Sequence, residues 1–202
     1  MLLEAKNVSF RYAKKDEFIL EHFNLEVRAG ERVALVGPSG CGKTTLAKIL
    51  AGYLRPSSGE VLVNGRALPS RGFCPVQMIH QHPELSVNPR HKMAKILAEG
   101  WTPDADTLRA LGIESAWLSR WPNELSGGEL QRFCIARALA PQTKFLICDE
   151  ISAMLDVITQ AQIWELLLNI AAKRNLGLLV VTHNMALAER VCERMVRCDD
   201  GA

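Results

Sequence analysis

Residues 33–44 read VALVGPSGCGKT, and this stretch decides the fold class. The continuous apolar run Val33–Val36 is typical of a strand buried on both faces of a parallel sheet. It leads directly into Gly37–Thr44, which matches G-x-x-x-x-G-K-[ST], and helical spacing follows from Thr44 to Leu50. Glycines there let the backbone wrap around phosphates so that its N–H groups point at the oxygens. An ordinary glycine-rich turn would not need a strand before it and a helix after it, so we predict a phosphate-binding loop.

The side chains of this loop are expected to contact different parts of a bound nucleotide and its metal ion. Lys43 is placed to meet the β- and γ-phosphates, and Thr44 is placed to ligate Mg²⁺. The helix that follows adds the positive end of its dipole. With ATP and Mg²⁺ as the expected cofactors, the predicted contacts of this segment are Gly37, Pro38, Ser39, Gly40, Cys41, Gly42, Lys43, Thr44 and Thr45.

Two carboxylates, Asp149 and Glu150, end a second apolar run, Phe145–Cys148. Neighbouring side chains on a strand point to opposite faces, so the two cannot do the same job. We predict that Asp149 holds Mg²⁺, directly or in its second sphere, and that Glu150 orients and deprotonates the attacking water. Acidic residues are common at exposed strand ends, and the pair is informative because the phosphate loop lies upstream.

The remaining pattern predicts an α/β domain. The run Leu178–Val181 repeats the buried-strand signal, and helical spacing appears over 129–139 and 157–172. The alternation of buried strands and helices is typical of a three-layer fold. Near the N-terminus, the alternating residues 23–28 favour a half-buried strand, and Val61–Val63 before Asn64-Gly65 favours a strand that enters a tight turn.

One segment differs in character from the rest. Residues 81–125 are short helical pieces interrupted by prolines. We therefore predict a single domain, 1–202, in which 1–80 and 126–202 form the core with a β subdomain and 81–125 form a helical subdomain.

The motif LSGGELQR at 125–132 narrows the class. Ser126 and Glu129 form an S-x-x-E capping box, which starts many helices that have no function. Gly127 and Gly128 are poor choices for stability in a first helical turn, because each lowers helix propensity. They make sense if a phosphate must approach the backbone N–H groups closely.

With this motif, the chain resembles the ABC ATPase family, whose signature LSGGQ is nearly reproduced as LSGGE. The resemblance covers essentially the whole chain and implies a RecA-like P-loop core with N-terminal antiparallel strands and a small helical subdomain. It implies that Tyr12 stacks on adenine, that Gln81 senses Mg²⁺ and the γ-phosphate, and that His183 contacts the γ-phosphate. Asp156 would lie in the loop that communicates across a dimer. Taken singly, Tyr12 would be a strand aromatic, Gln81 a loop polar residue, His183 a strand-end histidine and Asp156 a helix cap. Their order and spacing relative to the stronger motifs favour the functional roles instead.

The resemblance also implies an ATP sandwich. The phosphate loop of one subunit and Ser126, Gly127, Gly128 and Glu129 of another would enclose the same nucleotide. Activity would then need a second ATPase subunit, identical or related. Transmembrane permease subunits and, in the full system, a substrate-binding protein are the other expected partners. The chain would sit peripherally at the cytoplasmic face of the cell membrane.

Within the family, the segment Gln81–Arg90 is similar to the Q-D-x-x-x-S-x-N-P-R segment of the oligopeptide/nickel importer group, and residues 155–162 and 182–194 resemble that group too. Import of nickel, metal chelates or oligopeptides is the function that this likeness implies. His80, His82 and His91 suggest direct metal binding, but no matching carboxylate or cysteine set accompanies them. A loop that meets the permease is the alternative.

Composition limits the other function classes. The net charge of +2 gives no argument for a nucleic-acid partner, and we expect none. No apolar run reaches membrane-spanning length, the start of the chain lacks signal-peptide features, and six scattered cysteines fit a reducing cytoplasm. A soluble ABC ATPase of translation or DNA maintenance is the main alternative. Translation-type members carry two ATPase domains in one chain, whereas 202 residues have room for one. The DNA-repair type carries a long coiled coil, and no heptad run occurs in this sequence.

Several residues depart from the family pattern. Ile151 follows the glutamate where the family usually has proline, Ala153 replaces a serine, and His82 replaces an aspartate. The helical insert is shorter than usual, and relatives usually continue beyond residue 202. These departures raise the possibility that the chain is half of an unequal pair with a different ATPase.

Overall fold

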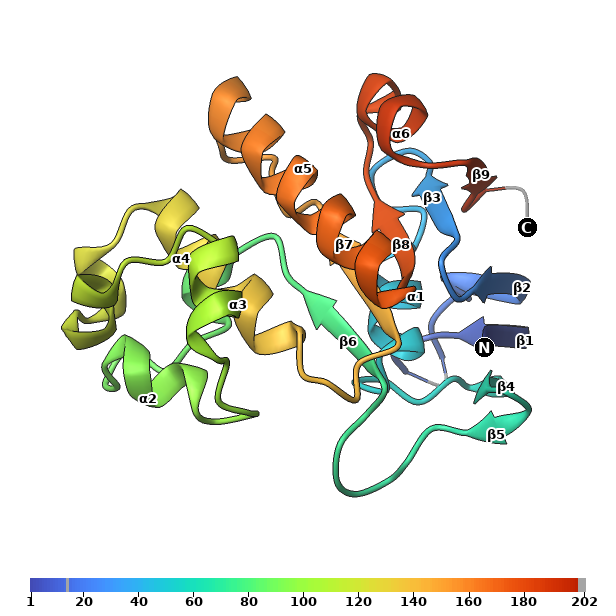
Figure 1. The fold of residues 1–202 in the computed structure, drawn as a ribbon. Coiled ribbons are helices and arrows are strands. Elements are labelled where there is room, and N and C mark those ends of the chain that lie inside the picture. The colour runs from blue at the N-terminus through green and yellow to red at the C-terminus, as the bar shows by residue number, and fades with distance from the viewer. Residues whose placement is uncertain (14, 200–202) are drawn as a thin grey trace.

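The computed structural model describes residues 1–13 and 15–199, which form two sheets with helices packed around them (Figure 1). The strands are β1 (Leu2–Phe10), β2 (Leu20–Arg28), β3 (Arg32–Val36), β4 (Ser58–Val63), β5 (Arg66–Ala67), β6 (Val76–Ile79), β7 (Phe145–Asp149), β8 (Gly177–Val181) and β9 (Arg194–Arg197). The helices are α1 (Lys43–Leu50), η1 (Pro83–Leu85), α2 (Met93–Leu97), α3 (Ala105–Ala110), η2 (Ser115–Ser119), η3 (Pro122–Glu124), α4 (Gly127–Ala138), α5 (Val157–Arg174) and α6 (Met185–Val191).

The central sheet has the strand order β6-β7-β8-β3-β9, and all its pairs are parallel. The phosphate loop leaves β3, whereas Asp149 ends β7, with β8 between them. Ligands of open α/β sheets bind outside the carboxyl ends of the strands. The topology therefore brings residues more than 100 positions apart to one edge of the sheet.

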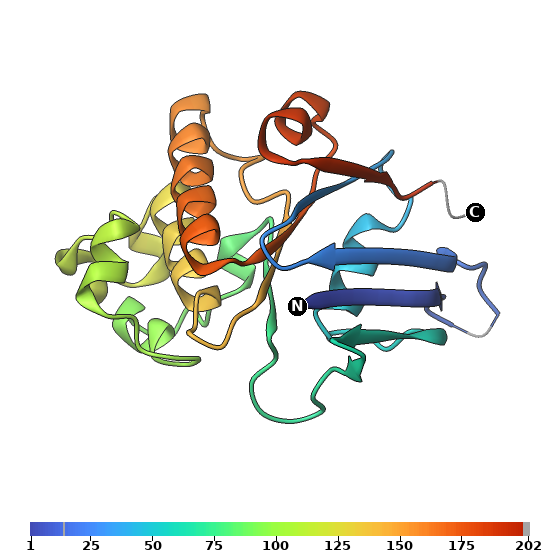
Figure 2. The ribbon, with the colours of Figure 1, turned by 45° about the vertical axis from the view of Figure 1, so that its right-hand side comes forward.

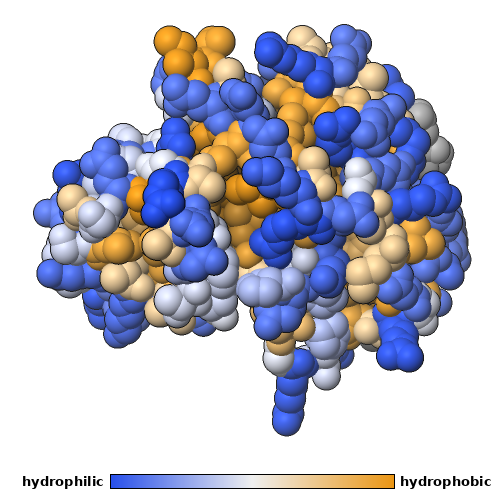
Figure 3. All heavy atoms as spheres, in the orientation of Figure 1, coloured by the Kyte–Doolittle hydropathy of each residue, from blue (hydrophilic) through white to orange (hydrophobic). Residues whose placement is uncertain are grey.

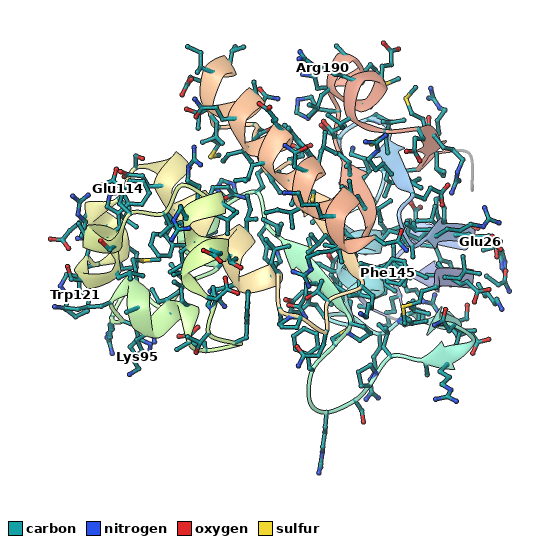
Figure 4. The ribbon with its side chains drawn as sticks, in the orientation of Figure 1. Glu26, Lys95, Glu114, Trp121, Phe145 and Arg190 are labelled. Carbon is teal, nitrogen blue, oxygen red and sulfur yellow. The ribbon has the colours of Figure 1, made fainter. Side chains whose placement is uncertain are left out.

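Continuous apolar strands are needed because alternate residues enter different cores. Leu146, Cys148 and Val180 pack with α4 and α5, while Phe145 and Ile147 face the core that contains α1 and the second sheet. Phe145 accordingly lies in the interior in Figure 4, in contrast to the peripheral Glu26 and Arg190. This burial on both faces confirms the three-layer α/β class.

The second sheet is antiparallel, in the order β2-β1-β4-β5, and lies beside the central sheet (Figure 2). Along β2, buried and exposed residues alternate as the sequence pattern predicts. Asn64 and Gly65, both with positive φ, form the two-residue turn between β4 and β5. Among the described residues, no helix has both the length and the apolar character needed to cross a membrane.

The short helices between β6 and α4 form the group on the left of Figure 1. Their core includes Met93, Ile96, Leu111 and Trp117, which join Phe133 of α4 in one apolar cluster. Helix α4, which follows the predicted segment 81–125, packs against η1 and α2. The division into a core and a helical subdomain 81–125 stays a prediction.

Candidate functional site

The phosphate loop connects β3 to α1 in a conformation that only glycine adopts easily. Gly37 and Gly42 have φ values of 151° and 99°. A Cβ at Gly42 would lie 2.9 Å from Leu20 Cδ2 and 3.2 Å from the carbonyl oxygen of Ile19. The loop is thus folded tightly against the start of β2, and larger residues are excluded there.

Lys43 lies inside the loop rather than in solvent. Its side chain is buried, and Nζ donates to the carbonyl oxygens of Gly37 and Pro38, both at 2.8 Å. An ammonium held there can exchange these carbonyl oxygens for phosphate oxygens, which are stronger acceptors because they are charged. This placement suits the predicted contact with the β- and γ-phosphates.

The predicted Mg²⁺ ligands come together from α1 and β7. The hydroxyl of Thr44 donates to Asp149 Oδ1 at 3.2 Å, across 105 residues of sequence. Burial raises the pKa of Asp149 above its usual value, the bond from Thr44 acts in the opposite direction, and the nearby Glu150 raises the pKa further. A carboxylate and a hydroxyl are hard oxygen donors that Mg²⁺ accepts, and its charge would stabilise the ionised carboxylate. The two residues therefore fit the cation.

Glu150 is held in an unusual backbone conformation beside His183. Its φ is 47°, in the left-handed region, and its Oε1 lies 2.9 Å from His183 Nδ1. The two side chains come from the ends of β7 and β8, and that of Glu150 is largely covered whereas His183 is exposed. A carboxylate oriented by a second side chain is the arrangement expected of a general base.

Gln81 follows β6 and faces the same end of the sheet. It lines a cleft of about 570 Å³ together with Thr44 and Asp149. Lys48, Tyr53, His80 and Arg137 also line this cleft. The sequence motifs mark His80 only as a possible metal ligand and do not mark the other three, because only the tertiary fold brings Lys48 and Tyr53, His80 and Arg137 together.

Tyr12 lies beyond the end of β1 and is 64% exposed. Its ring meets that of Phe10 edge to face, with centroids 5.0 Å apart. The end of β1 is joined to Ile19, whose amide donates to the carbonyl oxygen of Phe10 at 2.8 Å, and Ile19 lies against Gly42 of the loop. An exposed aromatic face on this segment is available for stacking on a base.

The signature residues open a second cleft. Ser126 caps α4: its hydroxyl accepts from the amide of Glu129 at 3.3 Å, and Glu129 Oε2 accepts from the amide of Ser126 at 2.6 Å. Gly127 and Gly128 line a cleft of about 370 Å³ that shares no lining residue with the cleft containing Thr44, Gln81 and Asp149. The capping box is present, and the cleft beside it is distinct from the cleft that Thr44 of the phosphate loop lines.

Asp156 caps α5 through its side chain. It accepts from the amides of Ile158 and Thr159 at 3.0 Å and from the hydroxyl of Thr159 at 2.6 Å. These hydrogen bonds, that of the Thr159 hydroxyl first, lower the pKa of Asp156. The helix-cap interpretation therefore holds, and Asp156 also borders the signature cleft.

The three loop histidines do not converge. His82 pairs with Glu84 at 3.0 Å, His91 pairs with Glu99 at 3.2 Å, and the ring of His80 lies beside Tyr53. Within 1–13 and 15–199, no group of three or more histidine, cysteine or acidic side chains is arranged to hold a metal ion.

Comparisons with known proteins identify the family. The ABC transporter family profile matches residues 20–153. Nickel import ATP-binding protein NikE of Escherichia coli O6:K15:H31 is 34% identical over 226 aligned positions, covering 99% of this chain and 84% of that protein. The NikE protein of Rhodospirillum rubrum is 36% identical, covering 91% of this chain and 73% of that protein.

Solved structures give the same result. A dimeric post-hydrolysis state of the ATP-binding cassette MJ0796, bound to ADP and Pi, superposes with a TM-score of 0.80 at 25% identity. It covers 96% of this chain and 93% of the other. The phosphate loop, the acidic pair and the capped signature helix thus occur together in a chain that belongs to the ABC transporter family and is one of its ATP-binding, ATP-hydrolysing cassettes.

Proposed function

We propose that this cassette energises an importer by closing with a second ATPase subunit around ATP and Mg²⁺. The observation that carries the proposal is that Thr44 of the phosphate loop, Gln81 and Asp149 line one cleft of the chain, whereas the signature residues line another with which it shares no residue. A nucleotide in the first cleft gains the signature residues only from another subunit. In that closed state Lys43 binds the phosphates, and Thr44 and Asp149 hold the Mg²⁺. The γ-phosphate and its attacking water are faced by Gln81, Glu150 and His183.

An exposed apolar surface beside the signature cleft supports the proposal that a second subunit binds there. Met154, Val157 and Ile158 are 63%, 81% and 72% exposed, and Met154 also borders the signature cleft. Figure 3 shows this apolar surface at the upper end of α5. Neighbouring exposed apolar residues mark interaction sites more often than isolated ones do. A partner that covers the signature cleft would cover these residues too.

Gly127 offers a test of the closed dimer. A Cβ at Gly127 meets no atom within 4 Å, so Gly127→Ala should raise the free energy of unfolding by about 0.5 kcal/mol through better helix propensity. In the dimer the added methyl would block the close approach of phosphate, and ATP turnover should fall on the order of tenfold. Urea unfolding and steady-state ATPase assays measure the two effects.

Asn169→Ala is the control, since it also raises helix propensity, at an exposed position of α5 that lines neither cleft. It should leave turnover unchanged. Normal turnover of Gly127→Ala would contradict the assigned approach of a nucleotide to this backbone. Gly128→Ala is less informative, because its Cβ would lie 2.9 Å from Thr159 Cγ2 of the same chain and would disturb folding directly.

We further propose that the imported cargo is nickel, a metal chelate or an oligopeptide. Nickel is supported by the name of the Escherichia coli relative NikE, a nickel import ATP-binding protein that is 34% identical over 99% of this chain. The cargo would be selected by permease and binding-protein partners, since site chemistry and not fold determines specificity. The cassette would bind peripherally at the cytoplasmic face of the membrane through the permease.

Purification of the tagged chain in mild detergent from its native membranes tests this assignment. The expected result is a complex with multi-span permease subunits and a second ATPase, whose identity separates an equal from an unequal pair. Nickel-stimulated or peptide-stimulated ATPase activity of the reconstituted complex would then identify the cargo. Copurification with ribosomes or DNA and without a membrane subunit would instead support the soluble alternative.

A further inference from the structure

Glu150 itself holds an unfavourable backbone conformation. A non-glycine residue at φ 47° persists only when its surroundings fix it. The next residue is Ile151, and an isoleucine leaves its own φ free, whereas a proline would have fixed it. Other contacts must therefore keep residues 150–153 in place.

Backbone and side-chain contacts hold these residues. The amide of Glu150 donates to the carbonyl oxygen of Val181 at 3.0 Å, and the amide of Ala153 donates to that of Glu150 at 3.1 Å. Ile151 and Ser152 are 2% and 3% exposed. The hydroxyl of Ser152 accepts a hydrogen bond of 3.0 Å from Nε1 of Trp164, itself 4% exposed. This indole N–H is the side-chain donor that ties the loop to α5.

We propose that Trp164 is a positioning residue for hydrolysis, acting through Ser152 to hold Glu150 at the attacking water. The proposal rests on the role assigned above to Glu150. A buried polar pair in apolar surroundings fixes geometry because either partner, left alone, would lose a hydrogen bond without regaining water. Nothing in the sequence motifs marks Trp164.

The same helix meets the signature motif. Thr159 and Leu155 lie against Gly128, and Asp156 caps the helix in that cleft. Trp164 lies five residues beyond Thr159 on α5, and Ser152 lies two residues beyond Glu150. The hydrogen bond from Trp164 therefore links the helix that borders the signature cleft to the loop that follows Glu150.

Trp164→Phe removes the N–H and keeps an aromatic ring. We expect kcat for ATP to fall roughly tenfold while KM stays within about twofold, because Glu150 loses alignment but the phosphate loop is untouched. Ser152→Ala should give the same loss, and the double variant should be no slower than either single one, because both remove one interaction. Ser152→Thr keeps the hydroxyl and should retain turnover.

Trp101→Phe is the matched control. Trp101 also donates an indole hydrogen bond, of 2.9 Å and partly buried, to the carbonyl oxygen of Ala136. Urea unfolding should show similar losses of stability in Trp101→Phe and Trp164→Phe, whereas only Trp164→Phe should lose kcat. Equal kcat in the two variants, or normal kcat in Ser152→Ala, would overturn the proposal.

The experiment also separates this inference from the role of Glu150. If Glu150→Gln is inactive while Trp164→Phe and Ser152→Ala are normal, Glu150 keeps its role and only the positioning by Trp164 fails. If Glu150→Gln itself turns over ATP normally, the premise fails, and any loss in Trp164→Phe has another cause.

Discussion

Glu150→Gln is expected to lower ATP turnover by at least about 100-fold, the contribution of a positioned general base, while ATP binding stays within about twofold. The amide keeps the size of the carboxylate and can still face His183 Nδ1, 2.9 Å away in the native chain. It cannot accept the proton of the attacking water. Lys43, Thr44 and Asp149 are unchanged, so the nucleotide and Mg²⁺ should still bind.

Two measurements separate these effects. Phosphate release under saturating ATP reports turnover, and equilibrium titration with a fluorescent ATP analogue reports affinity. Because hydrolysis is blocked after binding, the variant should also accumulate as an ATP-bound dimer in size-exclusion chromatography. Glu165→Gln, the same exchange at an exposed position of α5, should behave like the native chain. Near-normal turnover of Glu150→Gln would remove Glu150 from the mechanism.

The parts of this site that can be predicted from sequence are those fixed locally. The apolar run before Gly37 and the helical spacing after Thr44 predict a strand, a phosphate loop and a helix, and the structure places β3 and α1 there. Their chemistry depends on backbone N–H groups and on residues next to one another in the chain. The capping box at Ser126 is local in the same sense.

The contacts that could not be predicted depend on strand order. Glu150 and His183 meet because β7 and β8 are neighbours in the sheet, and no local pattern specifies that order. The bond between Trp164 and Ser152 has no periodic signal either, because a buried tryptophan on a helix is ordinarily a core residue. The placement of Thr44 and of the signature residues in two different clefts is likewise a property of the whole fold.

Lys43→Met should have the second large effect, which is a loss of ATP affinity and not a block of hydrolysis after ATP has bound. Methionine has nearly the length of lysine but no charge, so it can fill the buried space without contacting phosphate. Loss of charge-assisted hydrogen bonds to the phosphates, together about 3 kcal/mol, corresponds to roughly 100-fold weaker ATP affinity. Turnover falls as a consequence, even with Glu150 in place.

Comparing the two variants separates the role of Lys43 in binding ATP from the role of Glu150 in hydrolysing it. Glu150→Gln should bind ATP and fail to hydrolyse it, whereas Lys43→Met should fail at binding, and the same fluorescent titration distinguishes them. The loop carbonyls of Gly37 and Pro38 lose their donor in Lys43→Met, so circular dichroism must first establish that the chain is folded. Lys173→Met, at an exposed site in the last turn of α5, controls for the loss of one positive charge. Unchanged ATP affinity in folded Lys43→Met would mean that the loop amides and the α1 dipole alone bind the phosphates, and the ammonium would lose its assigned role.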